Sequence, residues 1–368
     1  MSKKSLRKLK GRLRKSPKHT SRVARGRRVW IIAICIVLGL GATGGMVARW
    51  KATLVSPTSS YMPLPVPSPT TPVLQREYVY AGSSLVAVAD PGVTPGVVTD
   101  LAVWRLTGTS ATWYVVNGET GSQSTQQWGT TGDLPAAGDF DGDAKTDFSV
   151  FRPSTGAWYI QRSTDGVLQS QVWGVSGDKP VPVDYDGDGR ADIAVFRPSS
   201  LTWYILKSSS NTTTTQQFGV TGDEPVPSDY DGDGKADLAV WRSSNTSWNI
   251  LQSSNGISRN QSWGQGTDKV VPGDYDGDGK TDVAVWRGSD NTWYILNSGA
   301  GTTTAIAWGV QSTDKAVQGD YDADGKTDIA VWRDPTGVWY IRKSSDGSMR
   351  ADQWGQSGDT PVPAPYRR

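Results

Sequence analysis

The sequence predicts an all-β protein, a β-propeller with six blades of four strands, and three observations support this prediction. A nine-residue acidic loop, Asp-Tyr-Asp-Gly-Asp-Gly-Arg-Ala-Asp at residues 184–192, occurs in five closely similar copies, 45 or 46 residues apart. Each interval contains four short segments with the alternation of apolar and polar residues that is typical of β-strands. No interval contains the ~3.6-residue apolar period of a helix. A repeat of this length with four strands describes one propeller blade.

The second unit illustrates the expected strands. An approach strand at Pro180–Tyr185 leads into the acidic loop, and an apolar strand at Ile193–Arg197 follows it. A strand that begins with Trp lies at Trp203–Leu206, and a polar strand ends in an aromatic-Gly pair at Gln216–Gly219. The loop therefore leads into a strand and not into a helix.

The number of copies of each part predicts how the ring closes. The strand that ends in Arg, the strand that begins with Trp and the aromatic-Gly pair each occur six times, but the acidic loop occurs five times. The missing loop falls where the ends of the repeat region meet, and Pro365 stands there in place of the first Asp. Residues 361–366 would then supply the first strand of a blade whose other strands come from residues 100–129, which protects the edge strands. The alternative is a seven-bladed ring in which residues 77–96, a predicted hairpin, form a degenerate blade.

Each acidic loop has carboxylates at positions 1, 3, 5 and 9, with Gly or Ala at positions 4 and 6, where the backbone turns tightly. Four carboxylates in nine residues repel one another unless a hard cation lies among them, and oxygen ligands at this spacing suit Ca²⁺. Acidic surface turns are the alternative, although turn preference alone explains five copies in register poorly. An EF-hand is excluded because Val replaces its bidentate Glu in every copy. The sequence therefore predicts about five Ca²⁺ ions, bound by Asp139, Asp141, Asp143, Asp147, Asp184, Asp186, Asp188, Asp192, Asp229, Asp231, Asp233, Asp237, Asp274, Asp276, Asp278, Asp282, Asp320, Asp322, Asp324 and Asp328.

The part before the repeats divides into segments of different composition. Residues 1–28 hold 13 Lys and Arg and no acidic residue, residues 29–48 are apolar and free of charge, and residues 49–76 are rich in Pro, Ser and Thr. About 20 apolar residues suffice to cross a bilayer as a helix, and the positive flank predicts a cytoplasmic N-terminus. We expect a basic cytoplasmic tail, a transmembrane signal-anchor helix and a stalk. Residues 77–96 and a propeller at 97–368 would then lie outside the membrane, at the cell surface or in the periplasm.

The N-terminal segments also allow two other interpretations. A basic stretch is typical of nucleic-acid-binding arms. Its position directly before an apolar segment favours a topology signal instead, so no nucleic-acid partner is predicted. Small residues after the most apolar part allow cleavage as a signal peptide, although no clear cleavage motif follows them.

The residue types after position 50 exclude several classes of enzyme. His19 is the only His and Cys35 the only Cys, so catalytic triads that need either residue and the usual zinc sites are excluded for the repeats. We therefore predict no enzyme activity and no catalytic residue. A glycosidase needs only two carboxylates, which keeps glycan hydrolysis as a distant alternative. The carboxylates that it would use lie in turns, at Asp165, Asp178, Asp223, Asp268, Asp290 and Asp314.

The repeated Trp and Arg residues each allow two interpretations. Aromatic side chains supply much of the buried area of small blades, but a Trp face also stacks on a sugar ring. The Arg at the end of each apolar strand is expected to pair with a nearby acidic loop, and a ring of anion-binding Arg is the alternative. The six Arg are Arg105, Arg152, Arg197, Arg242, Arg287 and Arg333.

An acidic loop followed by an apolar strand and repeated within a propeller resembles the FG-GAP or VCBS repeats of integrin α-subunit heads, some lectin propellers and many bacterial surface proteins. The resemblance covers the five loops and their flanking strands. It implies one Ca²⁺ per loop at the rim of a β-propeller, held by the four Asp side chains. Together with the predicted anchor, it implies a ligand-binding or adhesion module for a surface glycan or protein. A purely structural scaffold is the alternative.

Overall fold

The computed structural model describes residues 77–81, 84–89, 98–143, 145–310 and 313–362. Side chains are described from residue 98 onward. All these residues belong to one of the two compact units of the chain, Pro65–Arg368. Within them, no helix is long and apolar enough to span a membrane. The predicted tail, anchor helix and stalk lie outside this part of the chain.

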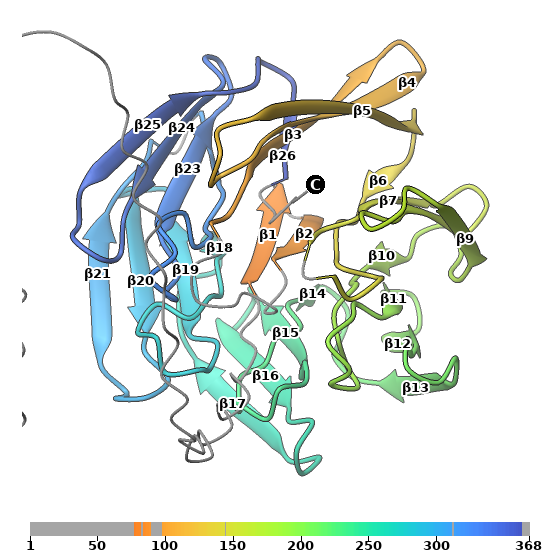
Figure 1. Ribbon diagram of the computed structural model, residues 1–368. Helices are drawn as coiled ribbons and strands as arrows, with labels where there is room; N and C mark the ends of the chain where they lie inside the picture. The colour runs from red at the N-terminus through yellow and green to blue at the C-terminus, as the bar shows by residue number, and fades with distance from the viewer. Residues whose placement is uncertain (1–76, 82–83, 90–97, 144, 311–312, 363–368) are drawn as a thin grey trace, which may run out of the picture. The chain divides into compact units, whose positions relative to one another are not determined.

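Six antiparallel sheets of four strands each form the blades (Figure 1). In five of them the four strands follow one another along the chain. The first two of these blades are β6–β9, at Leu134–Pro135, Phe148–Arg152, Ala157–Gln161 and Leu168–Val172, and β10–β13, at Lys179–Pro180, Ile193–Arg197, Thr202–Leu206 and Thr213–Gln217. The third is β14–β17, at Glu224–Pro225, Leu238–Arg242, Ser247–Leu251 and Ser258–Ser262. The last two are β18–β21, at Lys269–Val270, Val283–Arg287, Thr292–Leu296 and Thr303–Ala307, and β22–β25, at Asp314–Ala316, Ile329–Arg333, Val338–Arg342 and Met349–Gln353.

The sixth blade joins strands from both ends of the repeat region. Its strands are, in order, β26, β3, β4 and β5, at Thr360–Pro361, Leu101–Thr107, Ser110–Val116 and Gln123–Thr130. Thr360 lies opposite Trp104 and Pro361 lies opposite Val103. Figure 1 shows the late strand β26 beside the early strand β3. The prediction that the chain ends close a six-bladed ring is therefore confirmed.

The predicted hairpin also forms, because β1 (Glu77–Ala81) pairs antiparallel with β2 (Ser84–Ala89). These two strands make a separate two-stranded sheet, so the seven-bladed alternative is wrong. The first strand of each blade is shorter than predicted. In β10 the strand pairing ends after Pro180, and a bond from the Val181 N–H to the Ala194 carbonyl and an isolated bridge between Val183 and Asp192 follow. Pro182 lies between Val181 and Val183 and has no N–H to donate to a strand ladder.

A Trp on the third strand of every blade fills the blade interior. In β12 the burial alternates along the strand, so Trp203 is buried whereas Tyr204 is half-buried. The Trp203 ring lies 5.1 Å from that of Phe196 on the neighbouring strand, measured between centroids. None of the six side chains has exposed surface: Trp113, Trp158, Trp203, Trp248, Trp293 and Trp339. These six Trp therefore pack the blades, and they have no face for a sugar ring.

A second aromatic residue, in or directly after the fourth strand, joins each blade to the next. At five of the six junctions its indole N–H donates to the backbone carbonyl of a Tyr on the third strand of the next blade, at 3.0–3.2 Å. The pairs are Trp128 and Tyr159, Trp173 and Tyr204, Trp263 and Tyr294, Trp308 and Tyr340, and Trp354 and Tyr114. The last pair crosses the closure of the ring. At the sixth junction the two positions hold Phe218 and Asn249.

Each repeated Arg forms a two-point ion pair with an Asp at the beginning of its own blade, directly before the first strand or, for Asp314, at its first residue. Arg197 donates from Nε and Nη2 to the two carboxylate oxygens of Asp178, at 2.8 and 2.9 Å, and these bonds raise the pKa of Arg197 above its ordinary value. The other pairs are Arg105 and Asp359, Arg152 and Asp133, Arg242 and Asp223, Arg287 and Asp268, and Arg333 and Asp314. The prediction that these Arg pair with the acidic loops is wrong. The loop precedes the second strand and the Arg ends it, about 16 Å further along an extended backbone.

Candidate metal centres

Three of the four predicted carboxylates meet in every acidic loop. Loop positions 1, 3 and 9 each offer a carboxylate oxygen, and the three oxygens lie within 4.8 Å of one another. The groups are Asp139, Asp141 and Asp147; Asp184, Asp186 and Asp192; Asp229, Asp231 and Asp237; Asp274, Asp276 and Asp282; and Asp320, Asp322 and Asp328. Positions 1 and 9 are buried and position 3 is half-buried. The position-5 residues Asp143, Asp188, Asp233, Asp278 and Asp324 are not members of these groups.

Left-handed backbone at the small residues wraps the loop around its first carboxylate. Gly187 and Gly189 have φ angles of 83° and 85°, which only glycine adopts without strain. Their N–H groups donate to Asp184, and the bond from Gly189 is 2.8 Å long. In the last copy Ala323 adopts a φ of 61° at the position of Gly187. The sequence prediction of tight turns at loop positions 4 and 6 thus agrees with the backbone.

The ninth-position Asp connects the loop to the turn after the third strand. Asp192 has no exposed surface, and its Oδ2 accepts from the N–H of Tyr185 at 2.9 Å. Its Oδ1 accepts from the N–H of Ser208 at 2.7 Å. Each carboxylate oxygen retains a second lone pair for another partner. Two parts of the blade that are distant in sequence therefore hold this carboxylate in place.

Serine hydroxyls that the sequence analysis missed contact the remaining carboxylates. Ser208 Oγ donates to Asp188 Oδ2 at 2.8 Å, and Ser209 Oγ donates to Asp186 Oδ2 at 2.5 Å. The signal was present in the sequence, because a Ser follows the first loop Asp by 24 residues in every unit. These residues are Ser163, Ser208, Ser253, Ser298 and Ser344. In all five loops this Ser bonds to the position-5 Asp.

Burial of the clustered carboxylates raises their pKa values. Loss of hydration, the largest cause, raises the pKa of Asp192 to about 7, although bonds from Ser208 and Tyr185 lower it. Seven further loop carboxyls are affected in the same way. The pKa rises to about 7 for Asp147, Asp237, Asp274 and Asp328, and to about 6 for Asp229, Asp282 and Asp320. Several negative charges in a poorly hydrated site favour either protonation or a bound cation.

The free oxygens of the loops fit a hard metal ion. At position 3, Oδ1 of Asp141, Asp186 and Asp322 is buried and makes no hydrogen bond with any described residue. A buried carboxylate oxygen without a partner is costly unless a cation compensates it. All the available donors are carboxylate or backbone oxygens, which suit Ca²⁺ or Mg²⁺ and not the soft metals that prefer thiolates. Each of the five groups could therefore hold one metal ion.

Hydrogen bonds link the acidic loops in series around the ring. The backbone carbonyl of Asp184, the first residue of its loop, accepts from the N–H of Ala236 in the next loop at 2.9 Å. Equivalent bonds of 2.6–2.8 Å start from Ala191, Thr281, Thr327 and Thr99 and end on Asp139, Asp229, Asp274 and Asp320. The bond from Thr99 leads into the closure blade, which has no acidic loop. The backbone of each loop is thus hydrogen-bonded to the backbone of its neighbour.

The turn carboxylates considered for hydrolysis have structural partners. Asp178, Asp223, Asp268 and Asp314 are the buried members of the Arg ion pairs described above. Asp165 pairs with Arg162 at 3.0 Å, and Asp290 accepts from the hydroxyl of Tyr294 at 2.8 Å. The four Asp that pair with Arg have no exposed side-chain surface, so they are not solvated turn residues.

Six blades with five acidic loops define a repeat propeller that carries candidate metal centres. A family model described as FG-GAP-like repeat matches residues 139–195, 184–240, 229–285 and 274–331. The four matches overlap and together cover just over half of the chain. The chain belongs to this family of FG-GAP-like repeat proteins, so the resemblance seen in the sequence is confirmed.

Several solved propellers are similar to the chain in fold. TolB from Acinetobacter baumannii has a TM-score of 0.54 and 15% sequence identity, and the match covers 73% of this chain and 67% of TolB. An Agrocybe aegerita lectin, solved for its recognition of non-reducing terminal N-acetylglucosamine, has a TM-score of 0.47 and 15% identity over 76% of this chain and 90% of the lectin. A virginiamycin B lyase from Staphylococcus aureus has a TM-score of 0.42 and 9% identity over 70% of this chain and 85% of the lyase. At these identities the likeness concerns the fold alone, and no curated protein sequence matches the chain.

Proposed function

We propose that this protein is a membrane-anchored, extracytoplasmic propeller that binds Ca²⁺ in its five acidic loops and acts as a ligand-binding or adhesion module. Its ligand is a glycan or a protein at the cell surface or in the periplasm. The observation that carries the proposal is the set of five carboxylate groups, built alike in FG-GAP-like repeats around one ring. The basic segment 1–28 and the apolar segment 29–48 support the membrane anchor.

In this proposal the Ca²⁺ ions stabilise the ring, and the protein catalyses no reaction. Loop positions 1, 3 and 9 bind each ion directly, and the position-5 Asp lies beside them with its Ser partner. Extracellular modules bind Ca²⁺ with Kd values of roughly 10⁻⁴ to 10⁻³ M, so about 1 mM Ca²⁺ fills most of the sites. The loops support the rim where the blades meet, and the ligand binds to the surface that this rim holds in shape.

The test uses the full chain in a detergent without a sugar headgroup. Titration calorimetry with CaCl₂ should give about five sites per chain. The same preparation, applied to a glycan array and to intact cells, should bind in about 1 mM Ca²⁺ and lose binding in EDTA. A chain that takes up no Ca²⁺, or that binds neither glycans nor cells, would contradict the proposal. Calcium uptake without any ligand would favour the structural scaffold instead.

A further inference from the structure

One of the six blade junctions differs from the other five at both of its contacting side chains. It lies between the blade β10–β13 and the blade β14–β17. Phe218 replaces the junction Trp, and Asn249 replaces the Tyr that receives it. The Phe ring has no N–H, so the hydrogen bond between blades that the five other junctions share is absent here.

The same replacement changes the neighbour of one guanidinium group, although the Arg242 side chain is 23% exposed, within the 15–27% of the other five repeated Arg. In the five other blades the guanidinium carbon of the repeated Arg lies over a Tyr ring at 4.2–4.4 Å from its centroid. Arg242 has Asn249 at that place. It donates from Nε and Nη2 to Asp223, at 2.8 and 3.0 Å, and its Nη1 makes no hydrogen bond within the described residues. The guanidinium at this junction therefore lies beside an amide, whereas in the other five blades it lies over an aromatic ring.

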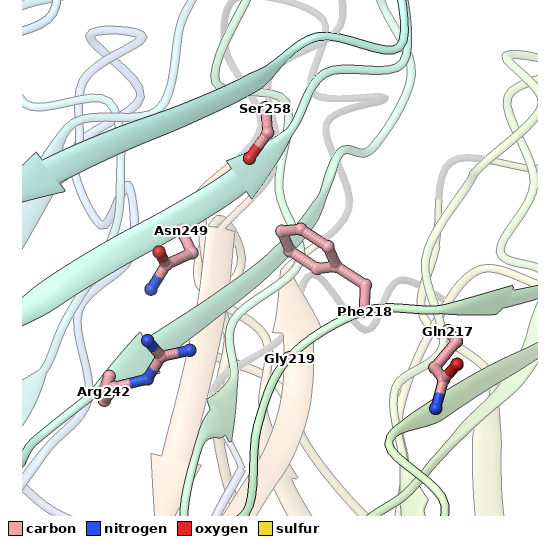
Figure 2. Close-up of a pocket in the computed structure, with 6 residues that line it drawn as sticks. All are labelled: Gln217, Phe218, Gly219, Arg242, Asn249 and Ser258. Atoms are coloured by element: carbon pink, nitrogen blue, oxygen red, sulfur yellow. The ribbon is translucent and has the colours of Figure 1, made fainter.

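A pocket lies at this junction. It has a volume of about 420 Å³ and is lined by Gln217, Phe218, Gly219, Arg242, Asn249 and Ser258. Figure 2 shows the Phe218 ring on one side, and Arg242 and Asn249 on two neighbouring strands on the other. The next junction, with Trp263 and Tyr294, has a smaller pocket of about 320 Å³. Volumes of ~300–1,000 Å³ are typical of small-molecule sites.

The amide at the centre of this pocket is held in place. Asn249 Oδ1 accepts from Asn260 Nδ2 at 2.6 Å, and Asn249 Nδ2 lies 3.2 Å from Ser247 Oγ. Asn260 stands opposite Asn249 on the neighbouring strand β17. A polar group fixed by two neighbours gives a ligand a defined partner at little cost in conformational entropy.

We infer that the pocket at Phe218 and Asn249 binds one neutral sugar ring of a glycan. An aromatic face beside amide, hydroxyl and guanidinium groups matches a sugar, which has an apolar C–H face and a polar rim. An anion is disfavoured because Asp223 already neutralises Arg242. A lipid is disfavoured because four of the six lining residues have polar side chains. The inference rests on the proposed ligand-binding function and gives it one site per chain.

The experiment restores the residues of the other junctions. Asn249→Tyr fills the pocket with the side chain that the five other blades already hold. The protein should therefore keep its melting temperature. The control is Tyr294→Phe, which keeps the ring at the equivalent place of the next junction. The full-length proteins, in Ca²⁺ and in a detergent without a sugar headgroup, are applied to a glycan array that carries neutral, sulfated and uronic-acid glycans. We expect the parent and the control to bind neutral glycans, and Asn249→Tyr to weaken that binding at least tenfold.

A second variant and four outcomes keep the inference testable. Phe218→Ala removes the aromatic face without filling the pocket, and it should also lower the affinity at least tenfold. Glycan binding that survives both substitutions would overturn the inferred site and leave the proposed function intact. Binding confined to sulfated or uronic-acid glycans would overturn the neutral sugar. A chain that binds cells through a protein and binds no glycan would overturn the inference alone, whereas a chain that binds neither would overturn both.

Discussion

The closure blade and the five loop-bearing blades have the same framework, but only the five carry a metal centre. All six blades contain the buried Trp and the ion pair between Arg and Asp. The closure blade has no acidic loop, and its strands β3, β4 and β5 are longer, with 7, 7 and 8 residues against 5 in each of β11, β12 and β13. Extended strand pairing thus accompanies the absence of the loop.

The closure blade keeps the ninth-position Asp of the loop, and this residue separates the roles of the carboxylates. Asp100 precedes β3 as Asp192 precedes β11, and it is equally buried. Its Oδ1 accepts from the N–H of Gly118 at 2.6 Å, as Asp192 does from Ser208. The ninth-position carboxylate therefore belongs to the framework of every blade. Positions 1 and 3 occur only where three carboxylates meet, so the framework does not require them, and they complete each group that could hold a metal ion.

Calcium removal should cause the largest loss of stability, because five of the six blades carry a candidate metal centre. Five sites with Kd values of ~10⁻⁴ to 10⁻³ M contribute about 2 to 7 kcal/mol to the free energy of unfolding at ~1 mM Ca²⁺. We expect EDTA to lower the melting temperature by about 5 to 15 °C, followed by calorimetry or circular dichroism. Excess Ca²⁺ added back is the control and should restore the original melting temperature. Identical melts in EDTA and Ca²⁺ would show that the loops are metal-free acidic turns.

Loss of the ion pair between Arg and Asp should lower the free energy of unfolding more in the closure blade than in an inner blade. Strand β26 comes last in the chain, so no short turn connects it to another strand of its blade. It is held by pairing with β3, by Arg105 on Asp359 and by the bond from the Val362 N–H to the Ala102 carbonyl at 2.7 Å. Arg105→Met leaves a buried carboxylate without its partner, and breaking such a pair costs roughly 3 to 5 kcal/mol. It also frees the last strand of the ring. Denaturant unfolding in Ca²⁺ should show this loss.

The matched variant is Arg197→Met, whose ion pair lies in a blade with consecutive strands. We expect it to cost about 1 kcal/mol less than Arg105→Met, because chain connectivity keeps β10 close to β11 after the pair is lost. Equal losses in the two variants would mean that the closure is no weaker than an inner blade.

Periodicity in the sequence was sufficient to predict the framework. The fixed interval predicted blades of four strands. The unequal numbers of loops and strands predicted that the ring closes between the two ends of the repeat region, where Pro361 pairs with Val103. The buried Trp were predictable too, because a large aromatic residue at one place in every strand pattern must be packed somewhere. Such features depend on spacing along the chain, which a sequence shows directly.

Contacts between separate strands were not predictable in the same way. The partner of Arg197 follows from the antiparallel pairing of β10 with β11, which brings Asp178 to the end of β11 and leaves the acidic loop at its start. The position-5 Asp and its Ser partner meet because the turn after the third strand folds back onto the loop. Phe218 and Asn249 stand out in the sequence as exceptions, but only the order of blades shows that they face each other.

Substitution of a single metal-site residue should lower the number of bound Ca²⁺ ions by one. Asp186→Asn removes one carboxylate of one group, so calorimetry should count one Ca²⁺ fewer per chain, and the unfolding free energy should fall by about 0.4 to 1.4 kcal/mol at ~1 mM Ca²⁺. Asp100→Asn in the closure blade should leave the number of ions unchanged. A Ca²⁺ lost with Asp100→Asn would mean that the closure blade also holds a metal.

The smallest expected effect is the pH dependence of the metal-free protein. Burial raises the pKa of Asp192 and Asp237 from about 4 to about 7. The folded state therefore binds more protons than the unfolded state between these values, and stability is lost as the pH rises from about 4 to about 7. In EDTA the melting temperature should be a few degrees higher at pH 5 than at pH 8, a smaller change than metal removal causes, because a loop can open to water without unfolding its blade. In saturating Ca²⁺ the order should reverse, since protons then compete with the ion for the same oxygens. A metal-free protein that is more stable at pH 8 than at pH 5 would mean that the loop carboxylates are already hydrated and ionised.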